Sequence, residues 1–332
     1  MKHHVTQLGI SLLLLTLGIS ACTDRHIAPV RAPSLLQQLP PQRLLAVNDI
    51  QFNNQPTTVL QMLVQDSSLY LTGRPFGFSK WDIGVDAENP HLTFAASTQI
   101  DRFFGKWVVD WFPSGALAVV GPYAIMSGTV GASIVDLSET GRPKEVRRYP
   151  DYQPQNDEVV SDAAYVWSAL VSHPFLPVLY AFRQQDAVLT FLINGTQLKP
   201  VLKNSYSATG GSECCANGAT VFGDKVFVAF RSKLVFFDMA SSGQLENPKA
   251  FLALHAVNVA STPEHLYVQH EPSAGTFEST QYPRGIYVFD KSGNNVAFLD
   301  ESPLAFAVSS DDRHLYGNMD DQSIRTFRIL WQ

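Results

Sequence analysis

A short unit recurs along this chain of 332 residues, and it constrains the fold more than any other feature. The unit is a polar turn followed by Leu-Tyr or a close variant, which opens an apolar strand. It occurs at Asp66–Tyr70, His173–Tyr180, Gly223–Phe227, Pro263–Tyr267 and Asp311–Tyr316. The last four aromatic positions are 47, 40 and 49 residues apart, whereas the first gap is 110 residues. We therefore expect a degenerate copy inside that gap, at Pro113–Val119, where Val replaces the aromatic residue.

A second unit follows these turns, and it is an apolar strand that ends near Asp. Its copies end at Asp82, Asp136, Asp238 and Asp290, and two further copies, 188–192 and 324–328, keep the strand without the Asp. A turn and another strand come next. Repeated four-strand units at a period near 40–55 residues are typical of a β-propeller, because small sheets packed radially bury the faces that no single sheet can bury.

The ends of the chain indicate how the ring closes. The last copy, 304–330, has room for only three strands, whereas an unassigned strand, Arg43–Ile50, precedes the first full copy. If that strand completes the last blade, the two ends are joined within one sheet. We predict an all-β domain over 43–332 with six four-stranded blades, closed by the N-terminal strand. Seven blades are the alternative, because the connectors 97–110 and 150–166 are long enough to hide one more.

This pattern resembles the LVIVD and YVTN/lactonase-like repeats of bacterial surface propellers. The resemblance covers 57–332, and it consists of the turn with Leu-Tyr followed by the apolar strand that ends in Asp. It implies a β-propeller, and it implies one of several roles: an extracytoplasmic binding protein, an adhesin, an assembly factor or an enzyme. Fold is therefore specified better than activity.

The N-terminus has the layout of a secretory signal peptide. Lys2 precedes an apolar run, Leu8–Leu17, which is too short to span a membrane, and small residues follow. The sequence Ile-Ser-Ala before Cys22 resembles the lipobox of bacterial lipoproteins. That resemblance implies cleavage after residue 21 and acylation of the Cys22 thiol, whereas the alternative is an ordinary signal peptide with a chance cysteine.

We expect three segments: a signal peptide over 1–21, the lipidated cysteine with a flexible tether over 22–42, and the propeller. The tether prediction rests on four prolines, Pro29, Pro33, Pro40 and Pro41. Thr23 follows the cysteine where Asp often marks retention in the inner membrane, so the lipoprotein resemblance favours the outer membrane, on its periplasmic face or at the cell surface. The formal net charge of −6, with no basic cluster, argues against nucleic acid as a partner.

The adjacent cysteines Cys214 and Cys215 lie in a glycine-rich segment, Gly210–Gly218. Adjacent Cα atoms are about 3.8 Å apart, below the usual disulfide range of about 4.4–6.8 Å, so a bond between these cysteines would be strained and the turn rigid. An oxidising compartment would allow the bond. Rigidification of the turn, contact with a ligand and redox catalysis are the three interpretations.

Several polar residues are candidates for the mouth of the central channel. The repeat alignment makes Cys214–Val221 lead into the inner strand of blade four, which places Glu213 and Asn217 near that mouth. The matching positions in other blades are Asp110, Asp162, His255 and Asn258. Lactonase-type propellers bind one divalent ion there through Glu, Asn and Asp, so this resemblance implies a channel site for an ion such as calcium. The alternative is a polar channel without a cofactor.

Three further groups of residues have simple structural interpretations. The histidines, including His265, fall in predicted turns or do not cluster, and the pairs Asp311–Asp312 and Asp320–Asp321 are expected to be turn formers with solvated carboxylates. Aromatic residues concentrate at the entries to blades two and three, where they form either core between blades or a patch for a protein or a glycan. They are Phe103, Phe104, Trp107, Trp111, Phe112 and Trp167.

Taken together, the residues favour a lipid-anchored propeller that binds a protein or a polymer such as a polysaccharide without catalysing a reaction. The alternative is a channel enzyme, lactonase-like with a divalent ion or, less favoured, a quinoprotein with a vicinal disulfide against its cofactor. Converging acidic or amide ligands in the channel would favour the enzyme. An exposed apolar loop face would favour the binding protein.

Overall fold

The computed structural model describes most of the chain beyond residue 40. The described residues are 41–42, 44–51, 58–74, 77–84, 86, 90–98, 116–128, 131–138, 143–149, 167–183, 187–205, 216–230, 233–252, 255–272, 282–319 and 323–331. Within these ranges every regular element is a strand, and no helix is long and apolar enough to cross a membrane.

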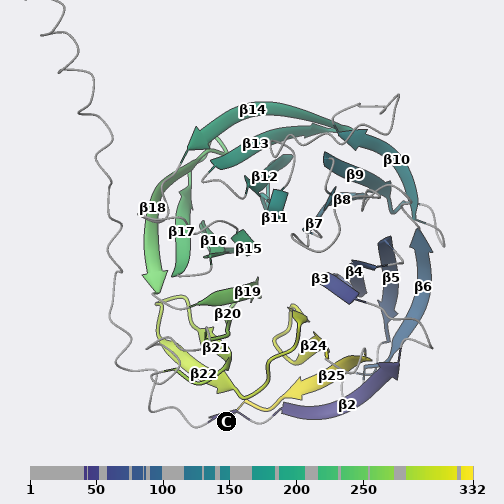
Figure 1. The fold of residues 1–332 in the computed structure, drawn as a ribbon, viewed down its shortest axis with the longest axis vertical. Helices are drawn as coiled ribbons and strands as arrows, with labels where there is room; N and C mark the ends of the chain where they lie inside the picture. Colours follow the sequence, from purple (N-terminus) through teal and green to yellow (C-terminus); the bar gives the residue numbers. More distant parts are fainter. Residues whose placement is uncertain are drawn as a thin grey trace, which may run out of the picture.

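Six antiparallel four-stranded sheets form a closed ring, which is a six-bladed β-propeller (Figure 1). Blade one consists of β3 (Thr58–Gln65), β4 (Ser68–Arg74), β5 (Gly77–Ile83) and β6 (Leu92–Thr98). Blade two consists of β7 (Leu117–Val120), β8 (Tyr123–Gly128), β9 (Gly131–Asp136) and β10 (Lys144–Tyr149). Blade three consists of β11 (Trp167–Ser172), β12 (Val178–Arg183), β13 (Ala187–Asn194) and β14 (Gln197–Ser205).

The second half of the ring follows the same order. Blade four consists of β15 (Ala216–Phe222), β16 (Lys225–Phe230), β17 (Lys233–Met239) and β18 (Leu245–Leu252). Blade five consists of β19 (Ala256–Ser261), β20 (Leu266–His270), β21 (Gly285–Phe289) and β22 (Asn295–Leu299). Blade six consists of β23 (Ala305–Val308), β24 (His314–Asn318), β25 (Ser323–Ile329) and the N-terminal β2 (Leu44–Gln51).

The ring closes as predicted, because β2 pairs antiparallel with β25 along its whole length, from Leu44 opposite Ile329 to Gln51 opposite Ser323. The structure adds one element to the prediction. Residues Pro41–Gln42, expected to be the end of the tether, form β1, which pairs in parallel with Phe298 and Leu299 at the outer edge of blade five. The N-terminal segment thus contacts two neighbouring blades.

The recurrent Leu-Tyr unit opens the second strand of its blade, and both of its side chains are buried there. Leu179 and Tyr180 are fully buried in β12, as are Leu266 and Tyr267 in β20. The copy expected at Pro113–Val119 is wrong by one strand, because its described end belongs to β7, the first strand of blade two. The equivalent of the motif is Tyr123–Ile125 in β8, where Ala and Ile replace Leu and Tyr.

The Asp that ends the third strand of several blades organises the turn that follows. Asp136 accepts hydrogen bonds from the backbone N and the Oγ of Ser138, at 2.8 and 2.6 Å, and these bonds lower the pKa of the Asp136 carboxyl. Asp290 accepts from the backbone N and the Nδ2 of Asn294 in the same way, at 2.8 and 3.0 Å. A short acceptor at this position therefore fixes the hairpin that leads to the outer strand.

Each outer strand contains an extra residue opposite the third strand of its blade, and β18 has a second register shift, between the partners of Phe236 and Asp238. The extra residues are Val47, Ala95, Val146, Val201, Phe251 and Val296. A bulge increases the local twist of a strand, which accounts for outer strands that run along the rim in Figure 1 while the inner strands run along the axis. It also explains why Val146, Val201 and Val296 are exposed although they lie in strands.

Apolar side chains fill every interface between neighbouring blades. Six clusters of buried residues are present, and each takes its members from two adjacent blades. The cluster between blades six and one joins Ala305, Tyr316 and Ile324 to Leu69 and Leu71, so the last interface is packed like the others. The ring is therefore held by a continuous apolar layer as well as by the shared sheet of blade six.

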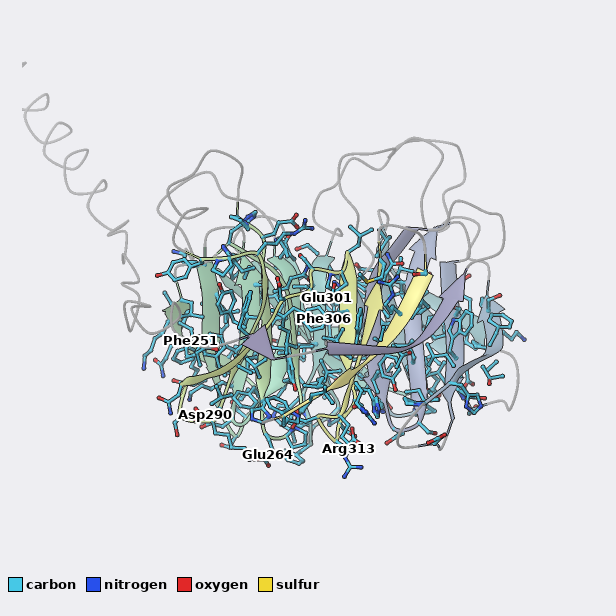
Figure 2. All side chains as sticks on the ribbon, turned by 90° about the horizontal axis from the view of Figure 1, so that it is seen from below. Phe251, Glu264, Asp290, Glu301, Phe306 and Arg313 are labelled. Atoms are coloured by element: carbon cyan, nitrogen blue, oxygen red, sulfur yellow. The ribbon has the colours of Figure 1, made fainter. Side chains whose placement is uncertain are left out.

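The two faces of the ring differ in the length of the connectors between strands. On one face the connectors are short, the longest being 84–91, and Figure 2 shows Glu264, Asp290 and Arg313 from such turns on this face. The strand ends at the other face are joined by the longest connectors, 99–116, 150–166, 206–215 and 271–284. We call the former the short-turn face and the latter the long-connector face.

Candidate functional site at the channel mouth

The inner strands begin at the long-connector face, and four of them carry a bulge at their first residues. The extra residues are Leu60, Ser168, Asn217 and Val257. All four are partly exposed, whereas Val59, Trp167, Ala216 and Ala256, which precede them, are buried. Because bulges redirect side chains at the rims of sheets, these positions mark the mouth of the channel.

Asn217 lies at this mouth, on β15. Its side-chain Nδ2 donates to the backbone oxygen of Ala256 at 3.3 Å, which ties blade four to blade five. Its own backbone oxygen accepts a hydrogen bond from the Nε2 of Gln61 at 3.1 Å. Gln61 belongs to β3, which lies across the ring from β15 (Figure 1). The Gln61 side chain therefore spans the channel at this level.

Asn258 lies on the neighbouring inner strand, β19, and is buried. Its Oδ1 accepts from the backbone N of Val259 at 2.8 Å. A Cβ on Gly218 would lie 2.9 Å from this oxygen and 3.4 Å from the Val259 nitrogen. Glycine at 218 is thus what allows the two inner strands to approach each other closely.

Hydroxyl groups continue the contact between β15 and β19 further along the channel. The Oγ1 of Thr220 lies 2.7 Å from the Oγ of Ser261, and Ser261 donates to the backbone oxygen of Val221 at 2.6 Å. With the Asn217 bond, these contacts form a column of side-chain hydrogen bonds between blades four and five. The column is a structural seam, since each polar group in it is used by its neighbour.

His255 lies at the same mouth, where it supports the start of blade five. Its Nδ1 contacts the backbone oxygen of Glu271, and the backbone N of Glu271 donates to the backbone oxygen of His255 at 3.1 Å. The Nδ1 of the fully buried His270 lies 3.1 Å from that same His255 oxygen. Burial lowers the pKa of the His270 imidazole, so this ring is neutral at pH 7.

A polar chain that the sequence did not reveal extends from this point to blade six. The guanidinium of Arg284 contacts Glu271 Oε1 at 3.2 Å, and its Nε donates to Ser302 Oγ at 2.9 Å. The Nε2 of Gln269 donates to the same Ser302 Oγ at 3.2 Å and to the backbone oxygen of Pro303 at 2.6 Å. These residues are separated in sequence and share no motif, so only the fold brings them together.

The described residues at the mouth do not fit a divalent ion. Within the described part of the chain, no group of three His, Cys, Asp or Glu side chains is arranged to hold a metal. The Asn258 amide oxygen is engaged by Val259, and the Asn217 amide is turned so that its nitrogen meets Ala256. Calcium requires several converging oxygen ligands, and these two amides do not provide them.

The other expected site residues lie outside the described ranges. They are the lipidation residue Cys22, the paired Cys214 and Cys215, and the channel candidates Asp110, Asp162 and Glu213. Their roles remain predictions.

Trp167 belongs to the core between blades rather than to an exposed patch. It is fully buried, and its ring lies 4.9 Å from that of Phe191 and 5.8 Å from that of Tyr149. The backbone oxygen of Trp167 accepts from Ser127 Oγ at 2.5 Å, which joins blades two and three. The other residues of the predicted aromatic cluster, all between 103 and 112, lie outside the described ranges.

On the short-turn face, Asp312 contradicts the expectation of a solvated turn former. It is buried, and its carboxylate accepts from the hydroxyl of Tyr267 at 2.8 Å and lies 3.2 Å from the Nδ1 of His265. The indole nitrogen of Trp331 donates to the Asp312 backbone oxygen at 2.8 Å, and the indole stacks on His265. Asp311, by contrast, caps the turn as expected, because it accepts from Ser309 Oγ and from the backbone N of Arg313.

Comparisons with known proteins support the β-propeller fold but indicate no function for this chain. No family model matches the chain, and no curated protein matches it. The WD40 domain of Pan2 from Neurospora crassa is similar, with a TM-score of 0.53 and 10% identity over 89% of this chain and 98% of that one.

Two further solved structures resemble the chain. A chain from the mitotic checkpoint complex gives a TM-score of 0.51 and 10% identity over 92% of this chain and 97% of that one. BamB from Moraxella catarrhalis gives a TM-score of 0.47 and 10% identity over 86% of this chain and 100% of that one. At this level of identity, the two likenesses above 0.5 support the β-propeller fold alone.

Proposed function

We propose that this protein is a lipid-anchored envelope protein whose propeller binds a protein or polymer partner on the long-connector face, without catalysing a reaction. The partner would be held by shape and by a few buried side chains, as at other protein interfaces. The propeller supplies a rigid frame, and the connectors supply the contacting residues.

This proposal rests on the difference between the two faces of the ring, which have connectors of unequal length. The short-turn face is built from tight hairpins that are satisfied by local bonds such as Asp136 to Ser138. Four long connectors join strand ends at the long-connector face, and the connector 99–116 contains two tryptophans and three phenylalanines. Aromatic residues dominate the binding energy of protein interfaces. This composition, on segments that the fold does not need for its blades, supports a docking role.

The geometry of the channel mouth argues for the same conclusion. Gln61 reaches across to Asn217, and the polar groups between β15 and β19 are engaged with one another. A channel enzyme needs unengaged groups that converge on a substrate, whereas the described residues here converge on each other. No described feature favours the lactonase-like alternative or the quinoprotein alternative.

The lipid anchor is proposed on Cys22 and rests on the lipobox resemblance. Cells that express the chain and are fed an alkyne analogue of palmitate should label it, and the Cys22→Ala variant should not be labelled. Label retained in the variant would contradict the anchor, and so would an unlabelled chain with Cys22 intact.

Site-specific photocross-linking in intact cells tests the docking face. A photoreactive residue at Trp107, in the connector between β6 and β7, should give one discrete adduct with a partner. The matched control is Phe175, whose side chain is 89% exposed in a turn of the short-turn face, and it should give none. Adducts from Phe175 alone, or from neither position, would refute the proposed face.

A further inference from the structure

The outer strands of the ring are sheet edges, and the chain itself covers one of them. Among the described strands, each outer strand pairs with a neighbour on one side only, except β22, whose other side pairs with β1. An uncovered edge presents backbone donors and acceptors that can pair with another chain. Natural proteins block such edges with charge or proline when pairing is unwanted.

The sequences of the outer strands show which edges are blocked. β10, β14 and β18 each contain lysine together with arginine or proline, and β2 contains Asp49. β22 has no charged residue and no proline, and β1 covers it. β6, with the sequence LTFAAST, also has neither, yet no described strand covers it. Among the described outer edges, β6 is therefore the one that is left both open and unprotected.

The side chains of β6 make this edge unusual as well. Phe94 is 53% exposed, and its ring meets that of Trp81 edge to face at 5.2 Å. Thr93 and Ser97 are also exposed. The strand thus combines an edge that no described strand covers with an exposed aromatic side chain. At its far end the Oγ1 of Thr98 donates to the backbone oxygen of Pro143 in blade two, so the accessible stretch is 92–97.

We propose that the edge of β6 binds an extended segment of a partner protein, which adds to blade one as a fifth strand. This mode of recognition takes its affinity from backbone hydrogen bonds and its specificity from alternate side chains. The parallel addition of β1 to blade five shows that an outer edge of this propeller accepts a fifth strand. The inference concerns the rim, so it goes beyond the docking face proposed above.

The shape of the rim favours a segment over a second copy of this chain. The seven residues of β6 span about 24 Å. Two rigid, convex rings that touch along one such strand would bury less than the roughly 1,200 Å² of a stable assembly. A single extended segment can instead follow the strand and also cover Phe94.

Charge near the edge defines the segment further. Asp82 lies opposite Thr93 in the adjacent strand and is 59% exposed, and Asp86 follows it on the surface. Lys80 contacts Asp82 at 3.7 Å and offsets part of this charge. The partner segment is therefore expected to carry a lysine or arginine at the end beside Thr93 and to be otherwise uncharged and rich in β-branched residues.

Hydrogen–deuterium exchange of the full-length chain in detergent, with a defined peptide, tests this proposal. The probe is an acetylated, amidated peptide of alternating valine and threonine with one terminal lysine. It should slow exchange over 92–97 by ~tenfold or more, because added strand bonds protect backbone amides. The same peptide with alternate backbone amides N-methylated should not slow it, since it keeps the side chains but loses the strand bonds.

Two matched variants locate the effect. Phe94→Lys should abolish the protection of β6, as a charge placed on the edge blocks pairing. Val201→Lys is the control, because Val201 is 52% exposed on the already blocked strand β14, and it should leave the protection unchanged. Equal protection of β14 or β18, or no protection of any strand, would overturn the proposal. Protection of β6 without peptide in a concentration-dependent dimer would overturn it in favour of a second copy.

Discussion

Asp312 joins blade six to blade five through its side chain, and its backbone oxygen binds a residue that follows the last strand of blade six. The carboxylate accepts the Tyr267 hydroxyl and contacts His265, and the backbone oxygen holds Trp331. Asp312 has a φ of 61°, a left-handed conformation that Asp adopts more readily than most residues. Blade six contains both ends of the ring, so this residue helps to hold the blade in which the chain closes.

Two buried tyrosines provide a matched test of that contact. Tyr267 donates to a carboxylate, whereas Tyr180 donates to the neutral backbone oxygen of Gly243 at 2.9 Å. Hydrogen bonds to charged groups contribute about 1.5–3 kcal/mol, and neutral ones about 0.5–1.5 kcal/mol. Tyr267→Phe should therefore lower the free energy of unfolding more than Tyr180→Phe does in urea titrations. Equal losses would show that Asp312 is not a special acceptor.

His270 should make stability depend on pH. Burial lowers the pKa of this imidazole from its ordinary 6.5, so the unfolded chain binds a proton that the folded chain does not. The free energy of unfolding should thus be highest above pH 6.5 and should fall as the pH drops below that value. His270→Asn should reduce this decrease in the free energy of unfolding at low pH, and the same substitution at the exposed His91 is the control. An unchanged pH profile in His270→Asn would contradict the assignment.

At the scale of the element, β2 and β1 act as a staple over two blades. β2 completes the sheet of blade six, and β1 adds to blade five. A chain that begins at residue 52 should lose the amide protection of β25 and should unfold at a midpoint lower by more than about 5 °C. A chain that begins at residue 41 is the control. Identical protection of β25 in both chains would refute the closing role of β2.

The sequence predicted the elements that leave a local pattern. Tyr180 and Tyr267 follow the same kind of turn and are both buried, and Arg43–Ile50 was identified as the missing strand of the last blade. Prediction from the sequence failed where an element leaves no local pattern. β1 is two residues in a parallel pairing, and blade two replaces Leu-Tyr with Ala-Ile, so the string at Leu117 in β7 resembles the repeat more closely than the true equivalent in β8 does.

The candidate site divides in the same way. Repeat alignment placed Asn217 and Asn258 on inner strands, because the strand period repeats from blade to blade. It missed Gln61, whose bond to Asn217 joins residues 156 positions apart. It also missed the buried state of Asp312, since a turn of two acids looks solvated until neighbouring blades pack over it.

At the scale of the whole molecule, the parts that stabilise the ring differ from the surfaces proposed to bind a partner. Six packed interfaces and the seam between β15 and β19 make the axis rigid, and the short turns satisfy their own polar groups. The long connectors all attach to the other face, and β6 leaves one edge open on the rim. The two proposed binding surfaces therefore lie outside the packed interfaces that hold the ring together.

Native mass spectrometry of the full-length chain, extracted from membranes in mild detergent and paired with elemental analysis, distinguishes a binding platform from a channel enzyme. We expect the lipidated chain with a stoichiometric partner and no stoichiometric divalent ion. The partner should be lost when Trp107 and Trp111 are replaced by alanine and should be retained in Phe175→Ala. A partner-free chain that carries one calcium ion, lost in Asn217→Ala, would contradict the account and return the function to the channel.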